Sequence, residues 1–119
     1  MPNPKSAPIL LCKLADLQPT GAFNAILTHR DKDLDLIITM DPDGTVHGYH
    51  NVCPHIQTPL ETFPHEFLDR NDPSLIVCST HGARFRLSDG KCLSGPCFGQ
   101  SLSPVTVTKR QGEIFLLPD

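Results

Sequence analysis

Two short stretches of the chain carry residue types that bind metals. Cys53 and His55 are separated by one residue in "NVCPHIQTPL", and Cys78 and His81 are separated by two residues in "VCSTHGARF". Each pair follows an apolar, strand-like run and precedes turn-forming residues. Two loops at one end of a β scaffold could therefore bring all four side chains to one centre.

The mixed composition of each pair distinguishes between metals. Structural zinc sites usually have C-x2–4-C and H-x3–5-H spacing, so that each pair shares one ligand type. A blue-copper site needs two His, one Cys and a weak axial group such as Met, and both Met1 and Met40 lie far from the motif. A Rieske [2Fe–2S] cluster takes two Cys on one iron and two His on the other, which one Cys and one His from each loop would supply. A zinc-binding structural module remains an alternative.

The pattern C-x-H, 22 residues, C-x-x-H and then glycine resembles the Rieske iron–sulfur family, specifically its small soluble ferredoxins. Upstream, "GTVHGYHNVCPH" resembles the strand that enters the first cluster loop. Downstream, "CSTHGARFRLSDGKCLSGPC" resembles the second cluster loop, its hairpin and the proline loop, and the resemblance covers about residues 34–117. The 22-residue spacer is longer than is common in the family. Its excess, "FPHEFLDRNDPS", is expected to form a surface hairpin that leaves the ligands in place.

The resemblance implies a role for each residue of the two loops. Cys53 and Cys78 would hold one iron of a single [2Fe–2S] cluster through thiolates, and His55 and His81 would hold the outer iron through ring nitrogens. Gly82 would let the backbone pass close to the cluster sulfides.

The resemblance also implies a reduction potential. Pro96 would cover the cluster and limit water. Thr58 and Thr80 stand where the high-potential branch of the family has a disulfide, and Ala83 and Phe85 stand where that branch has hydroxyl donors to the sulfur atoms. Hydrogen bonds to the sulfurs favour the reduced cluster, so their loss predicts a potential near roughly −150 mV rather than +300 mV.

A low potential implies an electron carrier rather than an enzyme. Such a protein would accept single electrons from an NAD(P)H-dependent flavin reductase and pass them to a terminal oxygenase or another redox acceptor. The chain carries no Rossmann glycine fingerprint and no flavin motif, so it is not expected to perform substrate chemistry alone. The small Rieske-like subunit of a nitrite reductase-type complex is the other redox alternative.

The composition limits the remaining function classes. The 119 residues fit one domain, 1–119, with a cluster-binding part at about 48–100. A net charge of −3 gives no electrostatic case for nucleic-acid binding. No apolar run approaches the ~18–20 residues needed to span a bilayer, and the N-terminus lacks a signal peptide, so a cytoplasmic location is expected. Five cysteines in a reducing compartment favour metal binding or packing over disulfides.

Short apolar runs between turn signals predict an all-β fold, a Rieske-like antiparallel β-sandwich or small barrel with a cluster-binding subdomain of two loops. Twelve prolines and eight glycines favour such a loop-rich fold, and a single helical turn near Ala15 is the only helix expected. Eight to nine strands are predicted, and the segments expected to contain them are 7–14, 22–29, 34–40, 45–51, 75–78, 83–87, 104–110 and 113–117.

The remaining cysteines, histidines and acidic residues are interpreted mainly as structural or surface residues. Cys12 is expected to pack in a strand. Cys92 and Cys97 flank the proline loop and are interpreted first as structural thiols, with a disulfide or redox role and ligation left open. The other histidines are expected on the surface or on strand faces, and the acidic residues near the loops on a solvated face; these are His29, His47, His50 and His65, and Asp16, Glu61, Glu66 and Asp69.

Overall fold

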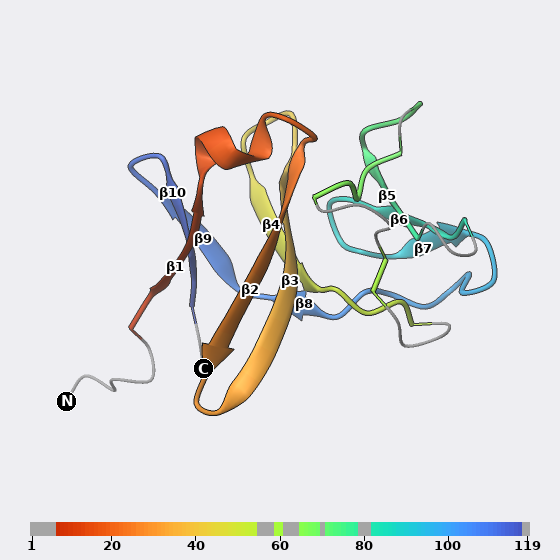
Figure 1. Ribbon diagram of the computed structural model, residues 1–119. Coiled ribbons are helices and arrows are strands. Elements are labelled where there is room, and N and C mark those ends of the chain that lie inside the picture. The colour runs from red at the N-terminus through yellow and green to blue at the C-terminus, as the bar shows by residue number, and fades with distance from the viewer. Residues whose placement is uncertain (1–6, 55–58, 61–64, 70, 79–81, 118–119) are drawn as a thin grey trace.

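The computed structural model describes residues 7–54, 59–60, 65–69, 71–78 and 82–117, to which all structural statements refer. Ten β-strands and one short 3-10 helix make up the described fold (Figure 1). The strands are β1 (Ile9–Lys13), β2 (Ala22–His29), β3 (Lys32–Met40), β4 (Val46–His50), β5 (Leu75–Val77), β6 (Arg84–Arg86), β7 (Cys92–Ser94), β8 (Pro104–Val105), β9 (Val107–Arg110) and β10 (Glu113–Leu116).

The largest sheet is antiparallel, with strand order β2-β3-β4-β8. β2 pairs along its whole length with β3 through a two-residue turn at Arg30 and Asp31, both of which have positive φ, 53° and 64°. Such turns match the right-handed twist of paired strands. Leu36, Ile37 and Ile38 of β3 are all fully buried, because this sheet has packed elements on both faces.

The pleat of β3 divides the interior into two cores. Leu36 and Ile38 lie in one core with residues of β1 and β10, and Ile37 lies in the other. Successive side chains of a strand point to opposite faces, so one strand serves both cores. The first core lies between the large sheet and the three-stranded sheet β1-β10-β9, which confirms the predicted antiparallel sandwich.

The predicted helical turn forms the 3-10 helix η2 (Leu14–Leu17), whose Asp16 carboxylate accepts a hydrogen bond from the Lys13 amide at 2.9 Å. Leu17 is buried in the core beneath it. Among the described residues, no helix has both the length and the apolar character needed to cross a membrane.

Two details of the strand prediction are corrected by the structure. The run 104–110 was expected to be one strand, but it forms β8, which pairs with β4, and β9, which pairs with β10. The chain crosses from one sheet to the other at Thr106, and a two-sheet sandwich requires such crossings. The three-residue strand β7 was not expected, since "KCLSG" has neither length nor alternation, and the described fold therefore has ten strands.

The small sheet β5-β6-β7 lies at the opposite end of the molecule from the β1-β10-β9 sheet (Figure 1). β5, β6 and β7 contain three residues each. The core beneath them is the second one, and it contains Ile37 of the large sheet together with four of the five cysteines of the chain. The two loops with the candidate ligands join this region.

Candidate metal centre

The two candidate thiols lie together in the interior of this end of the molecule. Cys53 follows β4 by three residues, and Cys78 directly follows β5. Both are fully buried and belong to the same core cluster. The expected imidazole ligands His55 and His81 lie outside the described residues, as do Thr58 and Thr80.

Asn51, which the sequence interpretation did not single out, fixes both ends of the first loop. Its side chain is 2% exposed. Its Oδ1 accepts a hydrogen bond from the amide of Leu60 at 2.9 Å, and its Nδ2 donates to Oδ1 of Asp35 at 3.2 Å. Its own amide donates to the Asp35 carbonyl at 2.8 Å. One buried amide thus joins the start of the loop, the end of the loop and β3. The available signal in the sequence was an asparagine two residues before Cys53.

The second loop is closed by backbone hydrogen bonds. The amide of Gly82 donates to the carbonyl of Cys78, and the amide of Cys78 donates to the carbonyl of Ala83, both at 2.8 Å. Gly82 has φ +72°, a conformation that residues with a side chain rarely adopt. No described atom lies within 4 Å of a Cβ built there, so the backbone conformation is the observed reason for glycine.

The proline loop packs directly on the second loop. A Cβ built on Gly95 would lie 2.7 Å from Cα of Ala83, closer than packed atoms approach, and Gly95 has φ +99°. Glycine is therefore required where the two loops touch. Beyond it, Pro96 is exposed and Cys97 is 1% exposed, so the loop presents its proline outward and its thiol inward.

Ala83 and Phe85 are both fully buried in the core that contains Cys53 and Cys78. Neither side chain carries a hydrogen-bond donor. The structure thus places the two residues expected near the cluster in the same core as the candidate thiols.

Cys92 and Cys97 are buried free thiols. Sγ of Cys92 donates to the carbonyl of Ser94 at 3.2 Å. Cys97 shares its buried core with Cys92 and Cys53. Burial, followed by these two neighbours, raises the pKa of Cys97 to about 12. The structure therefore agrees with structural thiols and holds no disulfide between them.

The spacer between the loops was expected to lie on the surface, and in part this is wrong. Phe67 is fully buried in the same core as the thiols, and its carbonyl accepts the amide of Val77 at 2.8 Å. An apolar side chain in the spacer gains more by filling this core than by remaining in water.

Asp69 was assigned to a solvated face and is instead largely buried. Its carboxylate is 9% exposed and lies 2.6 Å from Nε of Arg84. Arg84 also donates to the carbonyl of Gly82 at 3.2 Å, so its guanidinium links the spacer to the second loop. The hydrogen bond from Arg84, followed by one from the amide of Asn71, lowers the pKa of Asp69.

His65 anchors the other end of the spacer to the large sheet. Its Nδ1 accepts a hydrogen bond from the amide of Asn24 at 2.9 Å, and its ring stacks on Phe23 with a centroid separation of 4.6 Å. Its carbonyl accepts a hydrogen bond from the Thr20 hydroxyl. The longer spacer is therefore held at both ends by specific contacts.

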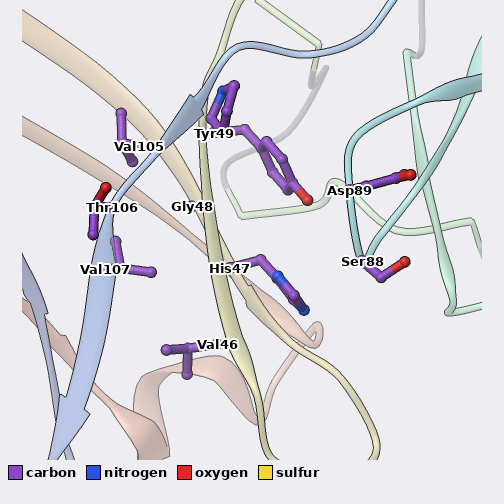
Figure 2. Close-up of a pocket in the computed structure, with 10 residues that line it drawn as sticks. Val46, His47, Gly48, Tyr49, Ser88, Asp89, Val105, Thr106 and Val107 are labelled. Atoms are coloured by element: carbon purple, nitrogen blue, oxygen red, sulfur yellow. The ribbon is translucent and has the colours of Figure 1, made fainter.

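A separate cleft of about 400 Å³ lies between the large sheet and the small region. Figure 2 shows the Tyr49 side chain extending from β4 toward the turn that carries Ser88 and Asp89. The Tyr49 hydroxyl donates to the carbonyl of Leu87 at 2.8 Å, and burial, followed by the charges of Asp89 and Asp41, raises the pKa of Tyr49 to about 12. Neither Cys53 nor Cys78 is among the described residues that line this cleft, which are Val46, His47, Gly48, Tyr49, Ser88, Asp89, Pro104, Val105, Thr106 and Val107.

The described donors fit one half of a diiron–disulfide cluster. Two buried thiols that share a core are the ligand set that such a cluster requires on its inner iron. Within the ranges that the structure describes, no three Cys, His, Asp or Glu side chains gather in a way that would hold a metal ion. The assignment of the imidazoles of His55 and His81 to the second iron therefore stays a prediction that the family resemblance implies.

Comparison with known proteins points to the same centre. The family model described as Rieske [2Fe-2S] domain matches residues 7–111. The ferredoxin of carbazole 1,9a-dioxygenase from Nocardioides aromaticivorans IC177 has a similar structure, with a TM-score of 0.71, 21% identity, and coverage of 96% of this chain and 100% of that one. No curated protein matches the chain.

Two further solved structures share the fold. A complex of reduced oxygenase and oxidized ferredoxin in carbazole 1,9a-dioxygenase matches with a TM-score of 0.69 and 20% identity over 94% of each chain. A protein named as a nitrite reductase NADPH (small subunit) matches with a TM-score of 0.66 and 17% identity over 93% of this chain and 98% of that one. At these identities the similarity establishes the fold.

Proposed function

Because the chain belongs to the Rieske [2Fe-2S] domain family, we propose that it carries single electrons through a [2Fe–2S] cluster held by Cys53, His55, Cys78 and His81. The observation on which this depends most is the burial of Cys53 and Cys78 in one core, at the ends of two loops. When bound, such a cluster accepts and releases one electron.

The chain's own described residues provide a buried, largely apolar surrounding for such a group. Cys53 and Cys78 are withdrawn from water, and Ala83 and Phe85 contribute apolar walls to the same core. Burial and the hydrophobic shell around a metal centre govern its solvent access and hence its redox potential. Pro96, exposed on the loop that packs against Ala83, is proposed to cover the centre from the solvent side.

The predicted low potential gains support from the surroundings of the thiols. The side chains of Ala83 and Phe85 are buried in the same core as the thiols and carry no hydrogen-bond donor. Voltammetry of the loaded protein is expected to give a midpoint near roughly −150 mV, at the low end of the Rieske range. Phe85→Tyr should raise the midpoint by about 59 mV, a tenfold change in the equilibrium constant for reduction, if its hydroxyl reaches a cluster sulfur.

Phe115→Tyr provides the control for that variant, because Phe115 lies in β10, in the sheet remote from the thiols. It should leave the midpoint unchanged. A wild-type midpoint above about +100 mV, well inside the high-potential part of the Rieske range, would contradict the low-potential assignment.

The proposed partners are an NAD(P)H-dependent flavin reductase and a terminal oxygenase. The complex of an oxygenase with its ferredoxin provides support, because a protein of the same fold is bound there to an oxygenase. Three apolar side chains are exposed: Val52, directly before Cys53, and Leu93 and Phe98, on either side of the proline loop, with 38%, 39% and 73% of their surfaces accessible. Transient redox encounters use small interfaces, generally below ~1,200 Å². A cytoplasmic location is proposed with these partners.

A second candidate is the small subunit of a nitrite reductase-type complex, favoured by the fold similarity to the protein of that name. The two functions predict different associations. A ferredoxin is expected to purify alone and to exchange electrons with a reductase, whereas a subunit is expected to co-purify with a larger enzyme.

The ligand assignment is tested by His81→Ala. The loss of one imidazole should remove the cluster's visible absorbance, its reduced EPR signal and its electron-transfer activity. His50→Ala is the matched control, because His50 ends β4 three residues before Cys53 and is not assigned as a ligand. Retention of the full Rieske spectrum by His81→Ala would show the assignment to be wrong. A colourless protein that binds zinc and no iron would instead favour the structural zinc module.

A further inference from the structure

The edge strands of the three sheets differ in how they are protected. A sheet edge presents unpaired N–H and C=O groups, and natural proteins protect it with charged side chains, proline, a bulge, a very short strand or a covering segment. The edge strands of the described sheets are β1, β9, β2, β8, β5 and β7. All of them except β2 have one of these protections along the strand.

The remaining edges of the two sandwich sheets are irregular, short or charged. β1 shifts register after Leu10. β8 has two residues and begins with Pro104. β9 carries the charged side chains of Lys109 and Arg110.

Both edges of the small sheet are covered by the chain itself. The amide of Val77 in β5 donates to the carbonyl of Phe67 at 2.8 Å, so the spacer lies along β5. The amide of Cys92 in β7 donates to the carbonyl of Gln100 at 2.8 Å, so the segment after the proline loop lies along β7.

The first half of β2 is covered in a similar way. The amide of Asn24 donates to Nδ1 of His65 at 2.9 Å, and the carbonyl of Ala22 accepts a hydrogen bond from the Thr20 hydroxyl at 3.0 Å. Both backbone groups therefore point away from β3. In an antiparallel pair the outward groups belong to every second residue, so those of Ile26 and Thr28 point the same way.

The second half of β2, residues 25–29, forms what we call the open edge. Within the described residues, the outward amides and carbonyls of Ile26 and Thr28 have no hydrogen-bond partner. The Ile26 side chain is 71% exposed. The strand sequence "AFNAILTH" contains no Lys, Arg, Asp, Glu or Pro, and its register with β3 is unbroken. None of the usual protections is therefore present on this half of the strand.

The open edge is complementary to itself. Two antiparallel copies related by a two-fold axis at Leu27 would place Ile26 of each opposite Thr28 of the other. Each such pair exchanges two N–H···O bonds, because the outward donor and acceptor of one residue face those of its partner. The pair also brings two β-branched side chains together on one face, an arrangement that stabilises sheets.

The charges at the ends of the open edge fit the same arrangement. In this register the exposed Arg30, in the turn after β2, would lie opposite Asn24 of the other copy. The edge beside Asn24 is covered by His65, and the next residue is the exposed Glu66. Each end of the paired strands would thus bring a cation near an anion.

We propose that the open edge pairs with the open edge of a second copy of this chain, so that two large sheets join into one. The segment is short, so the interface belongs to the small class, below ~1,200 Å² in total, and the dimer is weak and concentration-dependent. This inference does not rest on the proposed function, because it involves no candidate ligand.

Sedimentation equilibrium of the full chain over a range of protein concentrations tests the dimer. The apparent mass should rise from that of one chain to that of two and no further. Ile26→Lys places a charge on the open edge and should raise the dissociation constant about tenfold or more. Leu10→Lys is the matched control, because Leu10 is 51% exposed on the irregular edge strand β1, and it should leave the dissociation constant unchanged. A mass of one chain at every concentration, a mass above two chains, or equal effects of the two lysines would overturn the proposal.

Hydrogen exchange locates the contact in the wild-type protein. The amides of Ile26 and Thr28 should exchange about tenfold more slowly when most of the protein is dimeric than when it is monomeric. The amides of Ala25 and Leu27 point toward β3, so their exchange should not depend on concentration, and they are the internal control. Slow exchange of Ile26 and Thr28 at every concentration would show that the edge is covered within one chain. That result, or a dimer that forms without protecting these two amides, would overturn the proposal.

Discussion

The large sheet and the small sheet of this protein are stabilised in different ways. β2 and β3 have eight and nine residues and pair in an unbroken register. β5, β6 and β7 have three residues each, and the pairing of β6 with β7 shifts register between Arg84 and Phe85. Strands this short do not form an independently stable sheet unless something else packs against them.

The two cores beneath these sheets also differ in the residues that fill them. The core between the sandwich sheets contains aliphatic side chains and one cysteine, Cys12. The core under the small sheet contains four cysteines together with Tyr49, Phe67 and Phe85, and polar bonds from Asn51, Tyr49 and Arg84 hold its loops. The comparison indicates that the sandwich folds by burial of apolar surface, whereas the small region depends on a few polar contacts and on the group that its thiols would bind.

Removal of the cluster should therefore affect the two regions unequally, and this is the largest effect that we expect. After iron is chelated, amides of β5 and the second loop, such as those of Val77 and Cys78, should lose protection from hydrogen exchange by about a hundredfold or more. Amides in the β2–β3 pair of the same sample should change little and are the internal control. Native-state hydrogen exchange of loaded and iron-free protein measures both. Equal loss in the two regions would contradict the comparison.

Asn51 offers a test of the polar contacts themselves. Asn51→Ala leaves the buried amide of Leu60 without its acceptor, which should lower the free energy of unfolding by about 1–3 kcal/mol. It should also speed the loss of the cluster to a chelator, because the end of the first loop is released. Denaturant unfolding and the decay of the visible absorbance measure the two effects.

Asn24→Ala is the matched control for Asn51→Ala. Asn24 also donates to Oδ1 of Asp35, at 2.5 Å, and to the carbonyl of Leu36 at 3.1 Å, but the amide of Leu60, at the end of the loop, is bound by Asn51 and not by Asn24. It should lower the free energy of unfolding while the rate of cluster loss stays at the wild-type value. Equal rates of cluster loss in the two variants would show that the first loop does not depend on Asn51.

The sandwich was largely predictable from the sequence, because its strands are local apolar runs with turn residues between them. The segment 34–40 forms the C-terminal part of β3. "DPDG" forms the expected turn, in which the amide of Gly44 donates to the carbonyl of Asp41 at 2.9 Å. The split of 104–110 was not predictable in this way. Which sheet a strand joins depends on pairing with β4 and β10, which lie far away along the chain.

For the candidate centre, the sequence predicted which residues are candidate ligands, from their types and spacing. It did not predict the contacts that hold the loops. The thiols Cys53 and Cys78 do share a buried core. The contacts that position the loops and their spacer join residues far apart in the sequence, such as Asp69 with Arg84 and Asn24 with His65. Such contacts depend on tertiary packing, so an acidic residue in a spacer looks like a solvated one until its partner is placed.

The smallest predicted effect concerns the ion pair of Asp69 with Arg84, which joins the spacer to the second loop. The pKa of Asp69 lies below its ordinary value of 3.8, chiefly because of the hydrogen bond from Arg84. The native state thus favours the charged carboxylate. Its contribution to stability is complete above the ordinary pKa and is lost as the pH falls through the lower, native-state pKa. Stability of wild type should therefore decline below about pH 4 more steeply than that of Asp69→Asn, which has no carboxyl group to protonate.

Asp89→Asn, measured in the same experiment, distinguishes an effect on cluster retention from an effect on acid stability alone. Asp89 pairs with Arg86 at 2.6 Å, and this bond, followed by one from the Lys91 amide, lowers its pKa to about 2. Its side chain is 48% exposed, and its hydrogen bonds within the described residues go to Arg86 and the Lys91 amide. Both variants should flatten the acid limb of the stability profile. Only Asp69→Asn should also speed cluster loss at neutral pH, because the guanidinium that reaches the Gly82 carbonyl is then less firmly held. Identical cluster retention in the two variants would mean that Asp69 stabilises the spacer alone.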